Sequence, residues 1–327
     1  TATSYSITIK RRKLKESMNN NRSQPWQWVP SLYFTEGIPY FIVNSVALLM
    51  YKRCGLSDGV CALYASWLSL PWVIKPLWSP IVEILKSKQW WIVVMEMTMA
   101  IALAGVAFTL PTPYYVQLTM AFFFLIAFSS ATHDIAADGF YMEALDERQQ
   151  ALNVGVRSIF YRLSKVISEG QLIMFIGSLE VYTRSAFTAW SLGLGAVALL
   201  LALATLYHWV VLPKRTTSSE NTGTCVQNKA VFDEKQPTFV DETERGQTVR
   251  GAMKEFADTF VSFFKKPGIL MAITFLLLYR LPEAILTKIC PLFLTEKVSL
   301  GGLGLSTSEY GLAYGTLGVI GLLLGGI

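Results

Sequence analysis

Long apolar runs separated by short polar connections make up most of the chain. Each of the first seven runs is long enough to cross a hydrocarbon layer of about 30 Å as an α-helix, which needs roughly 20 residues. The eighth run is still apolar at Ile327. The runs lie at 27–51, 60–85, 90–110, 114–141, 151–178, 186–212, 268–294 and 308–327. This pattern predicts an all-α polytopic membrane protein.

A longer polar segment divides the runs into two groups. Lys214–Lys266 is rich in Thr, Glu, Asp and Lys, whereas the connections among the first six runs are short. Six helices, a polar linker and a second set of helices are typical of transporters built from two related halves. We therefore expect a major facilitator fold, with the first six-helix half followed by the start of the second half.

The two ends of the sequence need separate treatment. The chain starts at Thr1, and Met18 looks like a natural start, so residues 1–17 are set aside from the fold. The last run stops at Ile327 without an ending signal, and we expect the second half to continue. The expected parts are a basic N-terminus at 1–25, a six-helix half at 26–212, a cytoplasmic linker at 213–266, and helices seven and eight at 267–327.

Basic residues near the helix ends predict the orientation. Lys and Arg are enriched in cytoplasmic loops of membrane proteins. One side of the predicted bundle carries Arg22, Lys86, Lys88, Arg148, Lys214, Arg215, Lys265 and Lys266. The other side carries Lys52, Arg53 and Arg184. The N-terminus and the linker, with Cys225, are therefore expected in the cytoplasm.

Composition narrows the classes of partner. The chain is 52% hydrophobic and 16% charged, below the roughly 25% of soluble domains. The net charge of +5 comes from segments that flank the membrane, so we expect the lipid bilayer as a partner and no nucleic acid. Four cysteines without a C-x-x-C pair, and only two histidines, argue against a metal site. We also expect no cofactor, and a monomer.

Charged residues inside the apolar runs are the first sign of a functional site. Asp134 and Asp138 are four residues apart, so on a helix they share one face, about 6 Å from each other. A carboxylate inside a membrane helix costs roughly 2.5–3.5 kcal/mol on insertion scales and usually faces a polar path. The pair therefore indicates a pathway through the bundle.

Other charges fall at a similar depth. At about 1.5 Å per residue they lie roughly 10–18 Å from the cytoplasmic helix ends. They are Glu36, Lys75, Asp134, Arg157, Arg162 and Arg280. Buried charges need partners, so we expect them to pair across a central cavity. Asp138 and Arg157 fit a gate as well as a substrate or proton site, whereas Lys165 and Glu169 fit an intrahelical pair.

Several segments resemble the AmpG-type permeases, a branch of the major facilitator superfamily. They are Ser31–Tyr40, Leu70–Glu83, Ala131–Tyr141 and Gly155–Arg157. The resemblance implies proton-driven import of anhydromuropeptides across the bacterial inner membrane, as part of peptidoglycan recycling. Related branches carry acetyl-CoA, folates or iron chelates, so another small organic anion stays open as the substrate.

The resemblance and the charges that lie at a similar depth together suggest candidate roles. His133 stands where the family has Gln, and we place it among the substrate contacts. The expected substrate-binding residues are Lys75, Arg157, Arg162, Arg280 and His133. Glu36 and Asp134 are expected to carry the coupling proton, whereas Asp138 and Glu83 are expected to form a gate. The driving force would be the proton gradient.

Two other classes of protein, a membrane enzyme and a sensor, are alternatives to a transporter. The pattern H-D-x-x-x-D at His133–Asp138 could suggest metal ligation or phosphotransfer in a membrane enzyme. A metal site needs three or more convergent ligands, and the sequence shows no further phosphotransferase motif. A sensor without transport activity could use the same scaffold. We expect a transporter and not an enzyme.

Overall fold

The computed structural model describes residues 24–213, 251, 254, 258 and 260–325 of the 327-residue chain. The predicted N-terminus and most of the predicted linker, with Cys225, lie outside the described residues, so their assignment stays a prediction. Every regular element among the described residues is helical. The predicted all-α class is confirmed, and the hydrophobic lengths of the helices make the chain a multi-pass membrane protein.

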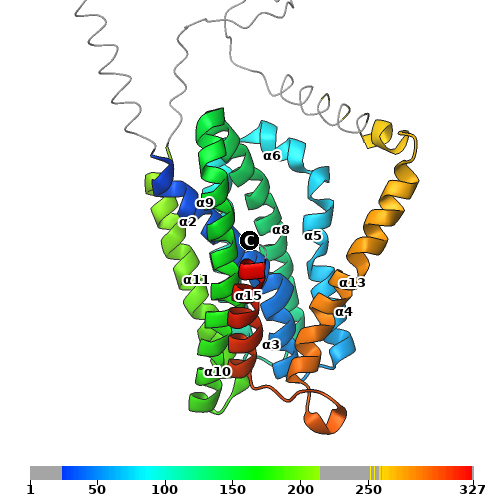
Figure 1. Ribbon diagram of the computed structural model, residues 1–327. Coiled ribbons are helices and arrows are strands. Elements are labelled where there is room, and N and C mark those ends of the chain that lie inside the picture. The colour runs from blue at the N-terminus through cyan, green and yellow to red at the C-terminus, as the bar shows by residue number, and fades with distance from the viewer. Residues whose placement is uncertain (1–23, 214–250, 252–253, 255–257, 259, 326–327) are drawn as a thin grey trace, which may run out of the picture.

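The first six predicted runs fold into one bundle (Figure 1). The third, fourth and sixth runs are single helices, and the other three are interrupted. The first helix comprises α2 (Pro25–Phe41), η1 (Ile42–Val46) and α3 (Ala47–Arg53), and the second α4 (Asp58–Leu68), α5 (Leu70–Ile74), η2 (Lys75–Leu77) and α6 (Ser79–Leu85). The remaining four are α7 (Lys88–Thr109), α8 (Tyr115–Ala144), the fifth helix of α9 (Glu147–Lys165), η3 (Val166–Gln171) and α10 (Leu172–Thr183), and α11 (Ala186–Val211).

The last two runs form helices that lie beside this bundle. The seventh is α13 (Ile269–Thr295), which is followed by the short turn η4 (Val298–Leu300). The eighth comprises α14 (Thr307–Tyr310), η5 (Gly311–Gly318) and α15 (Val319–Gly325). Each of the eight predicted runs is therefore helical in the part of the chain that the structure describes.

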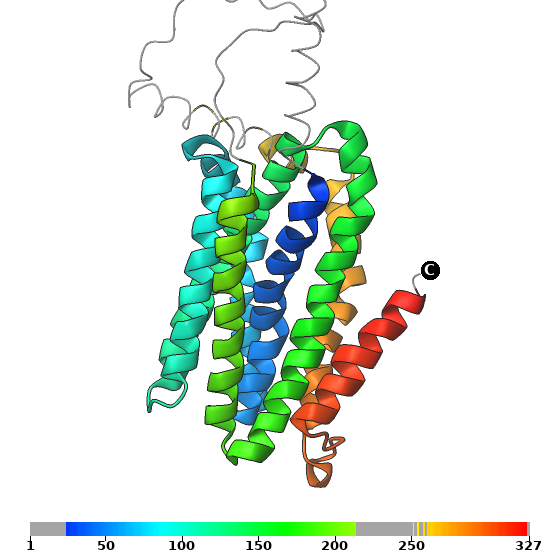
Figure 2. The ribbon, with the colours of Figure 1, turned by 90° about the vertical axis from the view of Figure 1, so that its left-hand side faces the viewer.

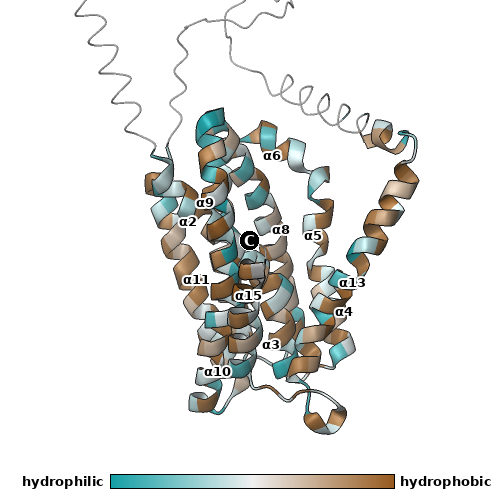
Figure 3. Ribbon diagram, in the orientation of Figure 1, coloured by the Kyte–Doolittle hydropathy of each residue, from teal (hydrophilic) through white to brown (hydrophobic). Residues whose placement is uncertain are grey.

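Six of the helices are apolar and long enough to cross a membrane: Pro25–Arg53, Asp58–Leu77, Lys88–Thr109, Tyr115–Ala144, Ala186–Val211 and Ile269–Thr295. The fifth helix is outside this group because polar and charged residues, among them Arg157, Arg162 and Glu169, dilute its apolar content. Figure 3 shows apolar colour along most helices and hydrophilic colour toward their upper ends. Charged residues within a membrane helix usually face protein or a polar cavity and not lipid.

Proline explains the interruptions of the first two helices. Pro39 lies inside α2 and removes a backbone donor, and a π-helical turn follows at Ile42–Val46. The second helix carries Pro71, Pro76 and Pro80 and passes through a 3₁₀ turn at Lys75–Leu77. The backbone of the second helix is therefore irregular at Lys75, which is predicted to bind the substrate.

The two groups of helices touch at one end of the molecule and separate toward the other. We call these the Cys54 end and the Pro25 end. In Figures 1 and 2, α13 and α15 approach the bundle near the Cys54 end and lean away from it toward the Pro25 end. The buried residues of α13, Pro291 and Leu292, lie in its last turns, whereas most of its earlier side chains are exposed.

Candidate functional site

Two adjoining polar cavities lie between the first, second, fourth and fifth helices. One has a volume of about 330 Å³ and the other of about 190 Å³. Both are lined by Glu36, Asp134 and Tyr161. The larger is also lined by Tyr33, Arg157, Ser158 and Arg162, and the smaller by Tyr40, Trp72, Lys75 and Ser130. We call the shared space the central site.

Local sequence explains how these side chains come together. Gly37 lets α2 approach α9 closely, because a side-chain carbon at this position would collide with the hydroxyl of Ser164. Glu36 is next to this contact and so lies at the junction with the fifth helix. On α8, Asp134 lies about two thirds of the way along a 30-residue helix. Lys75 projects from the break in the second helix.

An ion pair and a second, more deeply buried acid lie side by side in the central site. Lys75 and Asp134 form a salt bridge, and both side chains are partly exposed to the cavity. Glu36 is only 7% exposed, and its Oε2 has no hydrogen-bond partner among the described residues. A buried carboxylate oxygen without a partner is costly when the group is charged, so Glu36 is suited to hold a proton.

A second ion pair lies nearer the Pro25 end. The Arg157 guanidinium is 2.8 Å from Asp138 Oδ1, and the Tyr33 hydroxyl donates to the same oxygen at 3.1 Å. The guanidinium carbon also lies 4.5 Å from the centre of the Tyr33 ring, a cation–π distance. Asp138 and Arg157 thus join α8, α9 and α2, whereas only Arg157 also lines the cavity. Both a gate and a binding role stay open for this pair.

The structure brings together five of the nine residues predicted from sequence. Glu36, Lys75, Asp134, Arg157 and Arg162 line the central site. The predicted intrahelical pair of Lys165 and Glu169 is also confirmed, at 3.8 Å.

Three predicted residues lie elsewhere. Arg280 on α13 has a side chain that is 69% exposed, and it pairs with Glu283 one turn along the same helix. Glu83 is exposed on α6. His133 is fully buried, does not line either cavity, and faces Glu96 on α7. A substrate in the central site would not reach any of the three in this conformation, and their functional roles stay predictions.

A buried polar cluster was missed by the sequence reasoning. Glu96 lies 2.8 Å from His208 on α11 and 3.2 Å from His133 on α8. Glu96 is the single acidic residue in the apolar run 90–110, so the rule that singled out Asp134 would also have found it. We call Glu96, His133 and His208 the buried triad.

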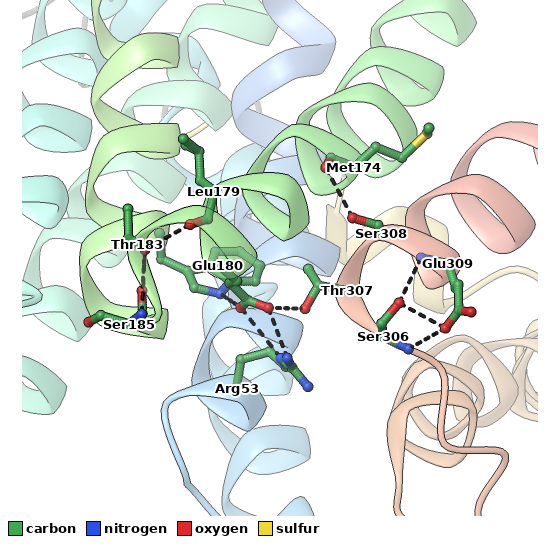
Figure 4. Close-up of polar contacts among 11 residues, drawn as sticks. Arg53, Met174, Leu179, Glu180, Thr183, Ser185, Ser306, Thr307, Ser308 and Glu309 are labelled. Atoms are coloured by element: carbon green, nitrogen blue, oxygen red, sulfur yellow. Dashed lines mark hydrogen bonds and ion pairs between the residues drawn. The ribbon is translucent and has the colours of Figure 1, made fainter.

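Polar contacts hold the two groups of helices together at the Cys54 end. Glu180 on α10 accepts hydrogen bonds from Arg53 at 2.8 Å, Trp190 at 2.8 Å and Thr307 at 2.6 Å (Figure 4). Thr307 opens the eighth helix, so this contact spans the two groups. Arg53 and Thr307 approach Glu180 from separate elements in the close-up.

A second tie joins the first and seventh helices. Lys52 forms salt bridges with Asp58 and with Glu296, which follows the last residue of α13. The hydrogen bond from Lys52 lowers the pKa of Glu296 below its ordinary value. Earlier on α13, the Lys288 ammonium donates to the backbone carbonyl of Asn44 at 2.9 Å. No comparable contact joins the two groups at the Pro25 end among the described residues.

Comparison with known proteins adds the family. The sequence model of the BT1 family matches residues 36–327. The chain is also similar to the anhydromuropeptide permeases of Escherichia coli strain K12 and of Escherichia coli O157:H7. Each is 22% identical over 305 residues, which cover 90% of this chain and 53% of the relative. The chain thus spans about half the length of the curated relatives it matches, and no solved structure matches it.

Proposed function

The chain belongs to the BT1 family, and from this membership we propose that it forms part of a secondary active transporter of the major facilitator type. The observation that carries the proposal is the central site. Two carboxyl groups and three cationic side chains meet in a cavity inside a membrane bundle, where isolated charges are costly. Such a site suits an anionic substrate that is carried together with a cation.

The arrangement of the two helix groups supports alternating access. The ties of Lys52 with Glu296 and of Glu180 with Thr307 close the Cys54 end. The helices separate toward the Pro25 end, where the central site would open. We propose that the Pro25 end is cytoplasmic, in a bacterial inner membrane, so that this conformation faces inward. The outward-facing conformation would require both ties to break.

We propose an anhydromuropeptide as the substrate. The two relatives from Escherichia coli are anhydromuropeptide permeases, and such a molecule carries several carboxylates. Lys75, Arg157 and Arg162 can bind carboxylates by charge-assisted hydrogen bonds. The site contributed by the second half would add further contacts, for which Arg280 on α13 is the candidate.

Proton coupling would follow from competition for Lys75. A substrate carboxylate that binds Lys75 displaces Asp134, which then lacks its cation in a partly buried site. Asp134 or the buried Glu36, whose Oε2 has no partner among the described residues, would bind a proton in response. Inward movement of an anion against a negative potential costs about 2.3 kcal/mol per charge per 100 mV, so co-transported protons are needed for uphill uptake.

Reconstituted full-length protein tests these proposals. An imposed inward proton gradient should drive uptake of labelled anhydromuropeptide into proteoliposomes, and a protonophore should abolish it. Uptake that follows a sodium gradient and ignores the proton gradient would show that the coupling ion is wrong. Uptake of another anion while the muropeptide is ignored would show that the substrate is wrong. Absence of any flux would contradict transport itself.

One observation favours a second substrate class. The central site is lined by aromatic side chains next to its cations: Tyr33, Tyr40, Trp72 and Tyr161. Flat aromatic faces suit a substrate with a planar ring, so an aromatic anion such as a folate fits the same site. Acetyl-CoA and iron chelates are further anions to include. Competition of each against muropeptide uptake ranks them.

A further inference from the structure

The residues just before the seventh helix form a short helical stretch of their own. Residues 260–264 are helical, and the backbone amide of Lys265 continues the pattern by donating to the Val261 carbonyl at 3.2 Å. The chain then passes through Gly268, whose positive φ of 76° suits glycine, into α13. In Figure 1 the short stretch turns away from the axis of α13 at the Pro25 end. We call residues 260–266 the leading segment.

The leading segment has an apolar and a polar face. Successive residues of an α-helix are rotated by about 100°, so the side chains divide into two groups. The apolar face consists of Phe260, Val261, Phe263 and Phe264. The polar face carries Ser262 and Lys265, and Lys266 follows at the end of the helical stretch. This division is typical of a helix that lies along a boundary between water and an apolar phase.

The apolar face is exposed although its side chains are large. Phe260, Val261, Phe263 and Phe264 are 51%, 50%, 43% and 51% exposed. The ring of Phe264 contacts both other rings, with centroids 5.0 Å from Phe260 and 5.5 Å from Phe263. The three rings thus form one continuous apolar patch. Such a patch on the surface of a protein marks contact with an apolar partner.

The position of the leading segment identifies the membrane as that partner. The helix that follows, α13, is long and apolar enough to cross a bilayer. The residues that immediately precede it therefore lie where the lipid headgroups meet the acyl chains. The leading segment is too short to cross the membrane, and an amphipathic stretch with Phe on one face and Lys on the other lies in the plane of this interface.

The two lysines select the kind of lipid. Both are exposed, and the Lys266 ammonium lies 5.8 Å from the centre of the Phe263 ring. A lysine beside an interfacial ring keeps its apolar stem with the ring and extends its ammonium toward the headgroups. Asp258 is the single acid among the described residues from 258 to 266, so this region is net positive. Adjacent ammonium groups at the membrane surface complement anionic headgroups.

We propose that the leading segment is a membrane-surface anchor that binds anionic phospholipids. Its apolar face lies among the acyl chains, and Lys265 and Lys266 bind the headgroup phosphates. The anchor fixes the start of the seventh helix at the leaflet on the Pro25 end, where α13 leans away from the first bundle. The inference goes beyond the proposed function, because it concerns a lipid surface and not the transported substrate.

Fluorescence quenching of the full-length protein in phosphatidylcholine nanodiscs tests the anchor. A fluorophore is attached to Val261→Cys on the apolar face or to Asp258→Cys on the polar side, in a background without the native cysteines; both positions are exposed. Nitroxide-labelled phosphatidylcholine should quench position 261 severalfold more than position 258, and aqueous acrylamide should do the reverse. Nitroxide-labelled phosphatidylglycerol at the same mole fraction should quench position 261 severalfold more than the phosphatidylcholine quencher does.

Variants show whether the lysines cause this preference. The double variant Lys265→Gln, Lys266→Gln should make the two lipids quench position 261 equally. Lys297→Gln, which removes an exposed lysine at the Cys54 end, should leave their ratio unchanged. A preference that survives in the double variant would overturn the role of the lysines.

Three results with the lysines intact would also overturn the proposal. Equal quenching of position 261 by the two lipids would exclude a preference for anionic headgroups. Equal quenching of positions 258 and 261 by acrylamide would place the apolar face in water. Protection of position 261 from both lipid and acrylamide would show that the apolar face packs against protein. None of these results depends on whether the protein transports a substrate, so they leave the proposed function to its own test.

Discussion

Helix α8 contributes residues to two polar sites, in which buried charged groups find their partners in different ways. The central site holds Asp134 against Lys75 beside a cavity, with both side chains partly exposed. The buried triad holds Glu96 between two histidines, and the side chains of all three are at most 1% exposed. The first arrangement can exchange partners with a bound anion, whereas the second is closed to one.

The two sites should therefore respond differently to mutation, one mainly in transport and the other mainly in stability. Asp134 can lose Lys75 and still meet water or substrate, so its replacement should affect transport more than folding. Glu96 is buried, so its loss leaves His133 and His208 without their shared partner inside the bundle. Each prediction below tests whether the two sites differ in this manner.

The largest expected effect is on stability and comes from the buried triad. Glu96→Ala should lower the free energy of unfolding by about 3–5 kcal/mol, because removal of one partner of a buried ion pair leaves the other unpaired. Denaturant unfolding in mixed micelles measures it. Glu283→Ala is the matched control, since its side chain is 65% exposed and pairs with an exposed arginine. Equal losses in both variants would contradict the distinction.

The next effect is on transport and comes from the central site. Asp134→Asn should reduce uptake at least about 100-fold, roughly 2.7 kcal/mol in the transport barrier, because the amide neither titrates nor forms an ion pair with Lys75. Unfolding should change little, since Lys75 keeps access to the cavity. Proteoliposome uptake and denaturant unfolding are measured together. Near-normal uptake would remove Asp134 from the transport path.

A smaller effect on transport is expected at the gate candidate. In Asp138→Asn the amide can still accept hydrogen bonds from Tyr33 and Arg157, although the ion pair is lost. Uptake should fall severalfold and not be abolished. Loss as complete as in Asp134→Asn would place Asp138 in the substrate or proton site and decide the question that the geometry leaves open.

The sequence predicts the helices well because each run of about 20 apolar residues leaves the backbone little alternative to a helix in a membrane. Depth along the helices also predicts that Glu36, Lys75 and Asp134 lie at one level, and they line one cavity. Depth does not predict toward which neighbours a side chain points. Arg280 is predicted at a similar depth, but it lies on α13, which leans away from the bundle, and its side chain is exposed.

Direction also explains the unexpected position of His133. It is next to Asp134 in sequence, but successive residues of an α-helix are rotated by about 100°, so the two side chains leave α8 on different faces. The partners of His133 are Glu96 and, through it, His208, from helices that are distant in sequence. No spacing rule connects residues 96, 133 and 208, and only the packing of α7 between α8 and α11 brings them together.

The smallest expected effect is at the Cys54 end, where a third kind of charge pair lies at the ends of two helices. Lys52 and Glu296 tie the first and seventh helices, and the pKa of Glu296 is lowered by the hydrogen bond from Lys52. A lowered pKa means that the tie contributes above the unfolded pKa of about 4.3 and is lost as the pH falls through the folded value. Glu296→Gln should weaken it at pH 7.

Spin labels at Ser57 and Ser299, in a background without the native cysteines, measure this tie. Both positions are exposed and lie near the two partners. We expect a broader distance distribution in Glu296→Gln at pH 7, and in the wild type only below about pH 4.3. Lys297→Gln, which removes an exposed neighbouring charge, should leave the distribution unchanged. Because a partly exposed pair at the helix ends contributes little, the shift in population should be severalfold at most. A separation of the ends as complete as full opening would show that this charge pair, and not packing around Leu292, holds the Cys54 end closed.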